Sequence, residues 1–375
     1  MSAKAEKDFL AEIAEEFPDD IDIGRDSADI IDWIETGNYA LNRIVSGNYF
    51  LGYPTAKITE LFGEPSTGKS LLIYMAIASF QKQFAENAVV ILDDVEDAYS
   101  NTQGDMCGVD SHRLLRINSA TVEEHFCKLF NGTKARMQEN EDGDTVKIPA
   151  KPGLIPLIRS KNPKARIMIA LDSVAMLSCE HEKTLAEEGM EKKDMSRSQL
   201  IRTGIRSNWD TIRDGGIFYL VANHVYDIIG GYGNQKGTPG GKAIPFMSSV
   251  RVELSNGGRI SEDNKNSDEG AKAIQIGARI VAYVKKNKVA PPFGRAVLDH
   301  YWDKPQTERA PGIDRMSGVV DLLAQDGIIH VASGMLTLPD KSKVRRGAFT
   351  EERFLALMES LREKVAVTET EQNKK

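Results

Sequence analysis

One short stretch combines glycines, a lysine and a serine in the order that phosphate binding requires. It matches the pattern GxxxxGK[ST] and consists of Gly63, Glu64, Pro65, Ser66, Thr67, Gly68, Lys69 and Ser70. The glycines let backbone N–H groups wrap a phosphate, and the start of a following helix adds a favourable dipole. Lys69 would reach the β- and γ-phosphates, and Ser70 would ligate Mg²⁺. The stretch, with Leu71 that follows it, predicts a site for ATP and Mg²⁺.

A carboxylate at the end of a second apolar run suits the same metal ion. The run 167–172 ends at Asp172, and the carboxyl ends of parallel strands are where ligands bind in open α/β sheets. An aspartate at a strand end is otherwise a turn or cap residue. Next to a phosphate-binding loop, we expect Asp172 to help hold Mg²⁺.

The base that activates water is expected on a third run. Ser173, not an acid, follows Asp172, so the base must come from elsewhere. The run 89–94 places carboxylates at the same edge of the sheet. Glu96 is the candidate base, with Asp93, Asp94 and Asp97 as alternatives, some of which would instead cap the following helix.

Polar groups after a fourth run suit phosphate sensing and nucleic-acid binding. His224 follows the run 216–223 and is a candidate sensor of the γ-phosphate; a histidine satisfied by local hydrogen bonds is the alternative. Residues 227–239 are rich in glycine and carry Tyr232 and Lys236. Backbone N–H groups, a lysine and a ring suit single-stranded nucleic acid, although flexible loops often have this composition.

Two further charged segments have two interpretations each. Residues 179–194 follow a strand on the ligand side, but such a segment is also typical of a solvated surface. Residues 285–288 hold three lysines at the end of another run. This cluster is either a solvated strand end or a contact with nucleic acid or nucleotide phosphates.

The elements that must position these groups are strands alternating with helices. The runs 57–63, 89–94, 167–172 and 216–223 are continuously apolar, as strands buried on both faces should be. They predict an α/β fold with a mostly parallel central sheet flanked by helices. Helical spacing runs from Ile201 to Ile212. The later runs 249–254 and 278–284 have no clear helix between them and are expected to pair antiparallel.

The ends of the chain and one internal stretch differ in texture. Residues 4–17 predict an amphipathic helix, which Pro18 ends before an acidic linker over 19–29. Residues 131–163 are polar and broken by prolines, which predicts a long surface excursion. After residue 303 we expect a small α+β domain with a helix at 319–325, a hairpin over 327–340, a helix over 351–365 and a disordered tail.

Composition narrows the class of protein. With 48 Lys+Arg and 55 Asp+Glu in 375 residues, the net charge of −7 argues against indiscriminate nucleic-acid binding but leaves room for a local basic site. No apolar run approaches the about 18 residues of a membrane span, so no membrane partner is expected. The three cysteines form no CxxC pair, which favours reduced thiols in a cytoplasmic protein.

Taken together, these residues resemble the RecA family of recombinases from about residue 34 to residue 365. The matching segments are IETGNYALNRIV (34–45), GEPSTGKS (63–70), DVEDA (94–98), IALDSVAML (169–177), TPGGKAIPFMSSVRVEL (238–254) and KKNKVAPPFGRA (285–296). The last two fall outside the pattern of generic phosphate-binding loops. Histidine at position 224, where bacterial RecA has glutamine, is similar to the UvsX recombinases of T-even-type bacteriophages and favours a phage-encoded protein.

The resemblance implies domains and site residues. It implies a polymerisation arm at 1–33, a RecA-type P-loop NTPase core at 34–302, a C-terminal domain at 303–366 and a tail at 367–375. Glu96 would be the catalytic glutamate, and Lys286 and Lys288 would contact the γ-phosphate of a neighbouring subunit's ATP. The candidate DNA contacts, on and beside two DNA-binding loops, are Lys192, Lys193, Arg197, Tyr232, Lys236, Gly240, Gly241 and Lys242.

The implied activity is a DNA-dependent ATPase that forms a helical filament on single-stranded DNA and catalyses homologous pairing and strand exchange. The partners would be single- and double-stranded DNA and further copies of the chain, with a recombination mediator and a single-strand-binding protein as additional candidates. Two alternatives use the same core: a hexameric DNA helicase motor, and a filament-forming protein that uses ATP only as a structural switch.

Overall fold

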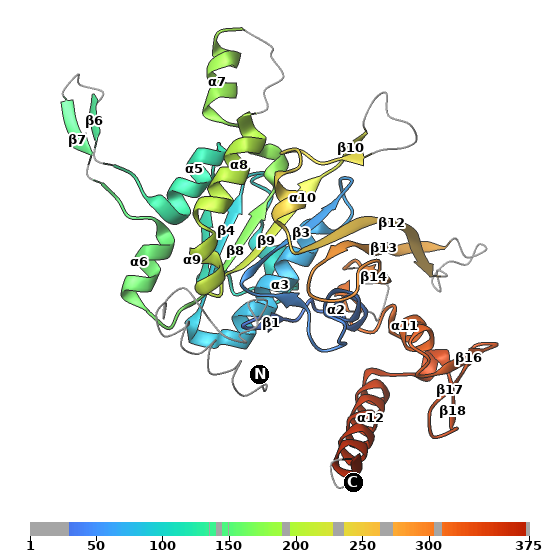
Figure 1. Cartoon of the computed structure of the whole chain (residues 1–375). Helices are drawn as coiled ribbons and strands as arrows, with labels where there is room; N and C mark the ends of the chain where they lie inside the picture. The colour runs from blue at the N-terminus through green and yellow to red at the C-terminus, as the bar shows by residue number, and fades with distance from the viewer. Residues whose placement is uncertain are drawn as a thin grey trace, which may run out of the picture.

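A mostly parallel sheet forms the centre of the molecule (Figure 1). The computed structural model describes residues 30–134, 136–139, 145–148, 150–189, 196–227, 236–262, 273–303 and 310–372. Within them, nine strands follow the order β15-β14-β13-β12-β3-β9-β8-β4-β5. The strands are β3 (Lys57–Gly63), β4 (Ala88–Asp94), β5 (Leu114–Ile117), β8 (Arg166–Asp172), β9 (Phe218–His224), β12 (Val250–Glu262), β13 (Ile274–Asn287), β14 (Arg295–Tyr301) and β15 (Gly312–Ile313).

The pairing directions confirm the predicted fold class. Neighbouring strands from β12 through β3, β9, β8 and β4 to β5 run parallel. β13 pairs antiparallel with β12, as the lack of a helix between them predicts, and β14 and β15 continue antiparallel. Strands β3, β4, β8 and β9 therefore end at one edge of the sheet, which brings the predicted phosphate loop, carboxylates and histidine together.

Helices cover both faces of the sheet. One face packs against α2 (Tyr39–Ser46) and α3 (Lys69–Phe84), and the other against α5 (Val122–Phe126), α8 (Ser196–Ser207), α9 (Trp209–Asp214) and α10 (Ala243–Met247). Smaller elements are β1 (Trp33–Ile34), β2 (Tyr53–Pro54), α4 (Asn101–Met106), α7 (Glu180–Glu187), β10 (Tyr226–Asp227) and β11 (Lys236–Gly237). Short helical turns are η1 (Ala85–Asn87), η2 (Ser111–Arg113), η3 (Cys127–Asn131), η4 (Val174–Met176) and η5 (Arg346–Ala348).

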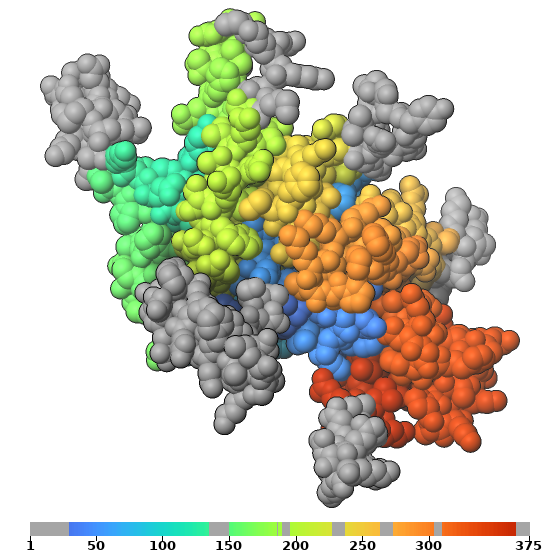
Figure 2. All heavy atoms as spheres, viewed as in Figure 1, coloured from blue at the N-terminus to red at the C-terminus, as the bar shows by residue number. Residues whose placement is uncertain are grey.

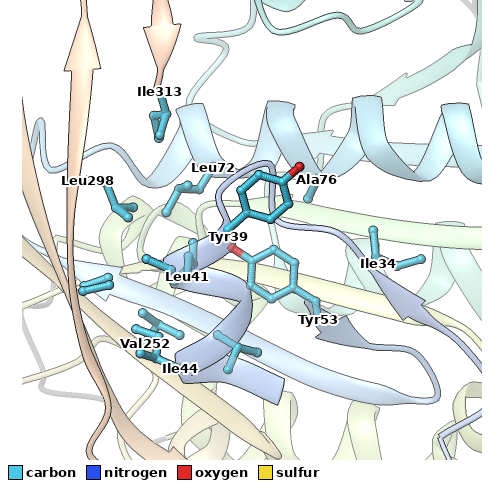
Figure 3. Close-up of a cluster of buried hydrophobic side chains, with 14 of the residues drawn as sticks. Ile34, Tyr39, Leu41, Ile44, Tyr53, Leu72, Ala76, Val252, Leu298 and Ile313 are labelled. Carbon is cyan, nitrogen blue, oxygen red and sulfur yellow. The ribbon is translucent and has the colours of Figure 1, made fainter. Parts of the chain in front are cut away.

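Figure 3 shows the core on the α2 and α3 side of the sheet. Leu41 and Ile44 of α2 lie near Val252 of β12, and Leu72 of α3 packs into the same cluster. These side chains are almost completely buried. Burial of this kind holds α3, and with it the loop before α3, against the sheet.

The C-terminal segment shares this core. It contains α11 (Val319–Gln325), β16 (His330–Ala332), β17 (Met335–Thr337), β18 (Lys343–Arg345) and α12 (Glu351–Gln372). The ring of Phe354 lies 4.9 Å from that of Tyr39 and 5.5 Å from that of Tyr49. This segment forms the orange and red lobe of Figures 1 and 2. The helix at 319–325 and the hairpin are confirmed.

Three expectations differ from the structure. The central sheet continues to Ile313, past the boundary expected at residue 303, because β15 pairs with β14. Helix α12 runs through Gln372, past the expected end at residue 365 and into the expected tail, since no glycine or proline interrupts it. The excursion at 131–163 contains a hairpin, β6 (Arg136–Glu139) with β7 (Thr145–Ile148), which projects from the body, and helix α6 (Leu154–Lys161).

The expected N-terminal helix and linker lie outside the described residues. Among the described helices, none is long and apolar enough to cross a membrane.

Candidate nucleotide site

The loop between β3 and α3 has the backbone that a phosphate cradle needs. Gly68 lies in the left-handed region at φ 89°, immediately before the first residue of α3. A Cβ atom on Gly63 would lie 2.2 Å from the carbonyl oxygen of Leu254, so only glycine fits where β3 meets β12. Thr67 Oγ1 donates to the Glu64 carbonyl oxygen at 2.8 Å and closes the loop.

Lys69 points back into this loop. Its ammonium donates to the carbonyl oxygens of Gly63 at 3.1 Å and Glu64 at 2.8 Å. Burial lowers the pKa of Lys69, while the charges of Asp172 and Glu96 oppose that shift. A buried ammonium held by neutral carbonyls has capacity to pair with an anion.

Asp172 and Ser70 offer oxygen atoms that suit Mg²⁺. Asp172 ends β8, is nearly buried and accepts a hydrogen bond from the hydroxyl of Ser70, the second residue of α3. Burial raises the pKa of Asp172, the Ser70 hydrogen bond opposes this, and the nearby charges of Glu96 and Asp94 raise it further. A hydroxyl and a carboxylate are the hard oxygen ligands that Mg²⁺ prefers. A cation would offset the crowded negative charge, so the residues present fit this ion.

Glu96 is held at the same edge by two polar partners. Ser173 Oγ donates to Glu96 Oε1 at 2.5 Å, and His224 Nε2 lies 2.8 Å from the same oxygen. Burial opposes ionisation, but the Ser173 and His224 hydrogen bonds outweigh it and keep the pKa of Glu96 below its ordinary value. The backbone N–H of Glu96 donates to the Asp172 carbonyl oxygen at 3.3 Å, which fixes the two strand ends together.

The alternative carboxylates have other contacts. Asp93 is buried and accepts hydrogen bonds from the Ser119 N–H at 2.9 Å and pairs with His125 Nδ1 at 2.6 Å. Asp94 accepts from the Ala98 and Tyr99 N–H groups at 3.0 Å each, and from Arg116 at 2.9 Å. The Asp97 side chain is 79% exposed and contacts Arg116 at 3.3 Å. Among these four acids, it is Glu96 whose carboxylate contacts Ser173 and His224.

The predicted interface lysines lie on β13 and just after it. Lys286 Nζ donates to the carbonyl oxygens of Pro245 at 2.8 Å and Phe246 at 3.0 Å, near the end of α10. Burial first, and then the positive charges of Lys288 and Arg251, lower its pKa to about 8, while the charge of Glu60 opposes the shift. Lys288 and the 68% exposed Phe246 line one open cavity. In a single chain, these lysines lie beside an apolar surface rather than at their own phosphate loop.

The predicted DNA contacts are only partly described. Lys192, Lys193 and Tyr232 lie outside the described residues, and the backbone of Lys236 pairs with Asp227 in a small hairpin while its side chain is not described. Gly240 and Gly241 have positive φ angles of 80° and 61°. Lys242 is exposed just before α10. Arg197 of α8 donates to the Leu177 carbonyl oxygen at 3.1 Å, so its guanidinium partly serves the fold.

Three features of the site escape the sequence analysis. Ser173 donates to Glu96, although the sequence offered it only as a missing acid. A buried set of hydrogen bonds joins Glu60, Asn223 and Arg251. The sequence hint was that Glu60 and Arg251 are charged residues within the apolar runs 57–63 and 249–254. A cavity of about 720 Å³ begins at Leu71 and follows α3 as far as Gln83.

A strand, phosphate loop and helix in a parallel sheet, with a carboxylate ending a nearby strand, define the class of P-loop nucleoside triphosphatases. Comparison with known proteins narrows this class. The sequence model described as the RecA N-terminal domain matches residues 4–126 and 156–305. The chain therefore belongs to the RecA family of recombinases. The unmatched residues include the β6–β7 hairpin.

Individual relatives cover most of the chain. Protein RecA of Fusobacterium nucleatum is 28% identical over 97% of this chain and 85% of its own length. Protein RecA of Chlorobaculum parvum is 29% identical over 91% of this chain and 83% of its own length. Protein RecA of Thermus aquaticus is 28% identical over 89% of this chain and 85% of its own length. These relatives are bacterial, and a phage origin stays a prediction from His224.

Proposed function

We propose that this protein is a DNA-dependent ATPase that assembles as a filament on single-stranded DNA and catalyses homologous pairing and strand exchange. The observation that carries the proposal is Glu96, held between Ser173 and His224 at the edge where the phosphate loop opens. Membership of the recombinase family supports the DNA partner. The proposed place of action is the bacterial cytoplasm.

The proposed chemistry is in-line attack of water on the γ-phosphate of ATP. Glu96, ionised because its pKa is low, would orient the water and accept its proton. Lys69 would turn from its loop carbonyls to the β- and γ-phosphates. Mg²⁺, held by Ser70 and Asp172, would neutralise charge on the phosphate oxygens. His224 contacts Glu96 directly, so it would transmit the state of the site to the segment that follows β9.

The second half of the proposed site comes from another copy of the chain. Lys286 is on β13, which β12 separates from β3 and its phosphate loop, and Lys288 follows the end of β13. Two lysines beside the exposed ring of Phe246 suit a subunit interface that supplies positive charge to a neighbour's γ-phosphate. DNA would bind to the segments 179–194 and 227–239 and to residues beside them, including Arg197 and Lys242.

The test measures ATP turnover and DNA pairing together. Single-stranded DNA should raise the ATPase rate, and electron micrographs with a slowly hydrolysed ATP analogue should contain open helical filaments. A homologous duplex should then yield joint molecules, while a heterologous duplex should not. Closed hexamers that unwind DNA would instead support a helicase. Filaments without DNA-stimulated turnover would support an ATP-switched binding protein.

A further inference from the structure

Three side chains link the strand before the phosphate loop to its neighbours on both sides. Glu60 of β3 and Asn223 of β9 are completely buried, and Asn223 Nδ2 donates to Glu60 Oε1 at 2.9 Å. Arg251 of β12, whose side chain is 16% exposed, donates its Nε–H to the other oxygen of Glu60. A buried carboxylate is costly unless it is paired, so the three side chains depend on one another. We call them the coupling cluster.

The strand register connects this cluster to both halves of the proposed site. Arg251 lies opposite Glu60 in the parallel pair of β12 and β3, and opposite Lys286 in the antiparallel pair of β12 and β13. Glu60, Arg251 and Lys286 therefore form one row across the sheet. At the other end, Asn223 immediately precedes His224, which contacts Glu96. The coupling cluster therefore lies between His224 and Glu96, which are proposed to act at the chain's own ATP, and Lys286, which is proposed to contact the ATP of a neighbouring subunit.

Asn223 also contacts the end of the proposed DNA-binding segment. Its Nδ2 donates to the Pro239 carbonyl oxygen at 3.3 Å. Because both groups near this nitrogen are acceptors, the orientation of the amide is fixed. Its Oδ1 is buried and has no donor among the described residues. The amide is therefore shared between Pro239 and Glu60 and retains an acceptor that a rearranged segment would satisfy.

We propose that the coupling cluster transmits DNA binding at the segment ending in Pro239 to Lys286, and so sets how strongly DNA stimulates ATP turnover. A displacement of Pro239 would change how Asn223 divides its hydrogen bonds, and Glu60 would adjust its pairing with Arg251. The charge of Arg251 acts directly on Lys286 beside it. Glu60, Asn223 and Arg251 touch no reacting atom and are positioning residues. The inference rests on the proposed function and specifies its regulation.

A double-mutant cycle tests this coupling in the full chain. Asn223→Asp removes both hydrogen bonds from the amide and sets a second carboxylate against Glu60. We expect the DNA-stimulated ATPase rate to fall about tenfold, as the loss of a buried, charge-assisted contact implies. The rate without DNA and the affinity for single-stranded DNA should change less than about threefold, because the phosphate loop and DNA contacts remain. Adding Glu60→Gln exchanges the amide and the carboxylate, and should restore part of the stimulation.

A milder variant and a matched control distinguish a loss of coupling from a loss of folded protein. Arg251→Lys keeps the charge but loses the directed guanidinium contact, and should also lower stimulation. Arg279→Gln removes an arginine of the same sheet, paired with Asp299 at 3.1 Å, and should leave stimulation unchanged. The melting temperature is measured for every variant.

The outcomes separate this inference from the proposed function. Full stimulation in Asn223→Asp, or equal losses of the rates with and without DNA that the exchange does not repair, would overturn the coupling alone. Absence of stimulation in the unaltered chain would overturn the proposed function and the coupling with it. Selective loss in Asn223→Asp with partial recovery in the double variant supports both.

Discussion

Glu96 illustrates how neighbouring side chains, rather than residue type, distinguish the proposed base from three other nearby acids. Asp93 and Asp94 are acceptors for backbone N–H groups and for basic side chains, and Asp97 points largely into solvent. Glu96 instead has Ser173 and His224 as its partners at the sheet edge. Both contacts keep the carboxylate ionised and oriented, which is the state that water activation requires.

Replacing Glu96 with glutamine should stop hydrolysis while ATP still binds. The amide preserves size and hydrogen bonding but cannot accept a proton, so the turnover rate should fall by about 10²–10⁴-fold. Filaments with ATP should persist in electron micrographs. Asp97→Asn, one residue away, is the control and should keep its turnover. Rapid hydrolysis by the glutamine variant would assign the base to another acid.

Lys69→Ala should abolish ATP turnover, because no other residue of the loop 63–70 carries a positive charge for the β- and γ-phosphates. Removing a preorganised charge from a phosphate site costs about 10²–10³-fold or more in rate. Lys164→Ala, at an exposed loop position, removes the same charge elsewhere and should behave like the unaltered chain. Turnover near the normal rate in Lys69→Ala would contradict the assignment of this loop.

At the scale of elements, the apolar runs predicted the central strands, because a parallel strand that is buried on both faces is itself a nearly continuous run of apolar residues. Local signals could not predict that β15 pairs with β14. β15 consists only of Gly312 and Ile313, and two residues are too few to carry a strand pattern of their own. The cluster of Glu60, Asn223 and Arg251 also escaped, because its members come from three strands whose neighbours only the sheet order reveals. The phosphate loop was predictable since its chemistry is contiguous in sequence.

A buried contact between three elements should dominate local stability. His125 of α5 pairs with Asp93 of β4 at 2.6 Å and with the Tyr219 hydroxyl of β9 at 2.5 Å. His125→Leu should lower the free energy of unfolding by about 3–5 kcal/mol at neutral pH, because it leaves a buried carboxylate without its main partner. Tyr219→Phe, the control, removes one hydroxyl and should cost about 1 kcal/mol. Urea unfolding measures both.

The pH dependence of that loss has a definite sign. Burial opposes the ionisation of Asp93, but the contacts with His125 and Ser119 outweigh it and hold its pKa below the ordinary value. This stabilisation is present above the unfolded pKa of about 3.9 and is lost as pH falls through the folded value. Without His125, burial penalises the charged form, so the difference between the two chains should narrow on acidification. A difference that widens would contradict this account.

At the scale of the whole molecule, the proposed assembly should respond to pH through Lys286. In the single chain its pKa is lowered to about 8, chiefly by burial and then by Lys288. A neighbour's phosphate would favour the charged form, so assembly takes up protons and should weaken as pH rises through about 8. Light scattering with an ATP analogue measures this. Lys286→Arg, always charged, should flatten the dependence, and a flat profile in the unaltered chain would contradict it.

Subunit mixing tests whether the proposed ATP site is divided between chains. A variant with Lys286→Ala and Lys288→Ala should bind ATP through its intact loop, yet lose turnover because its neighbours lack the completing charges. A Lys69→Ala chain has those lysines and lacks the loop charge. When the two assemble together, some sites pair an intact loop with intact lysines. The mixture should therefore hydrolyse ATP although neither variant does alone, with a maximum at an intermediate mixing ratio. No recovery in filaments proven to contain both chains would assign the lysines to their own chain's site or to none.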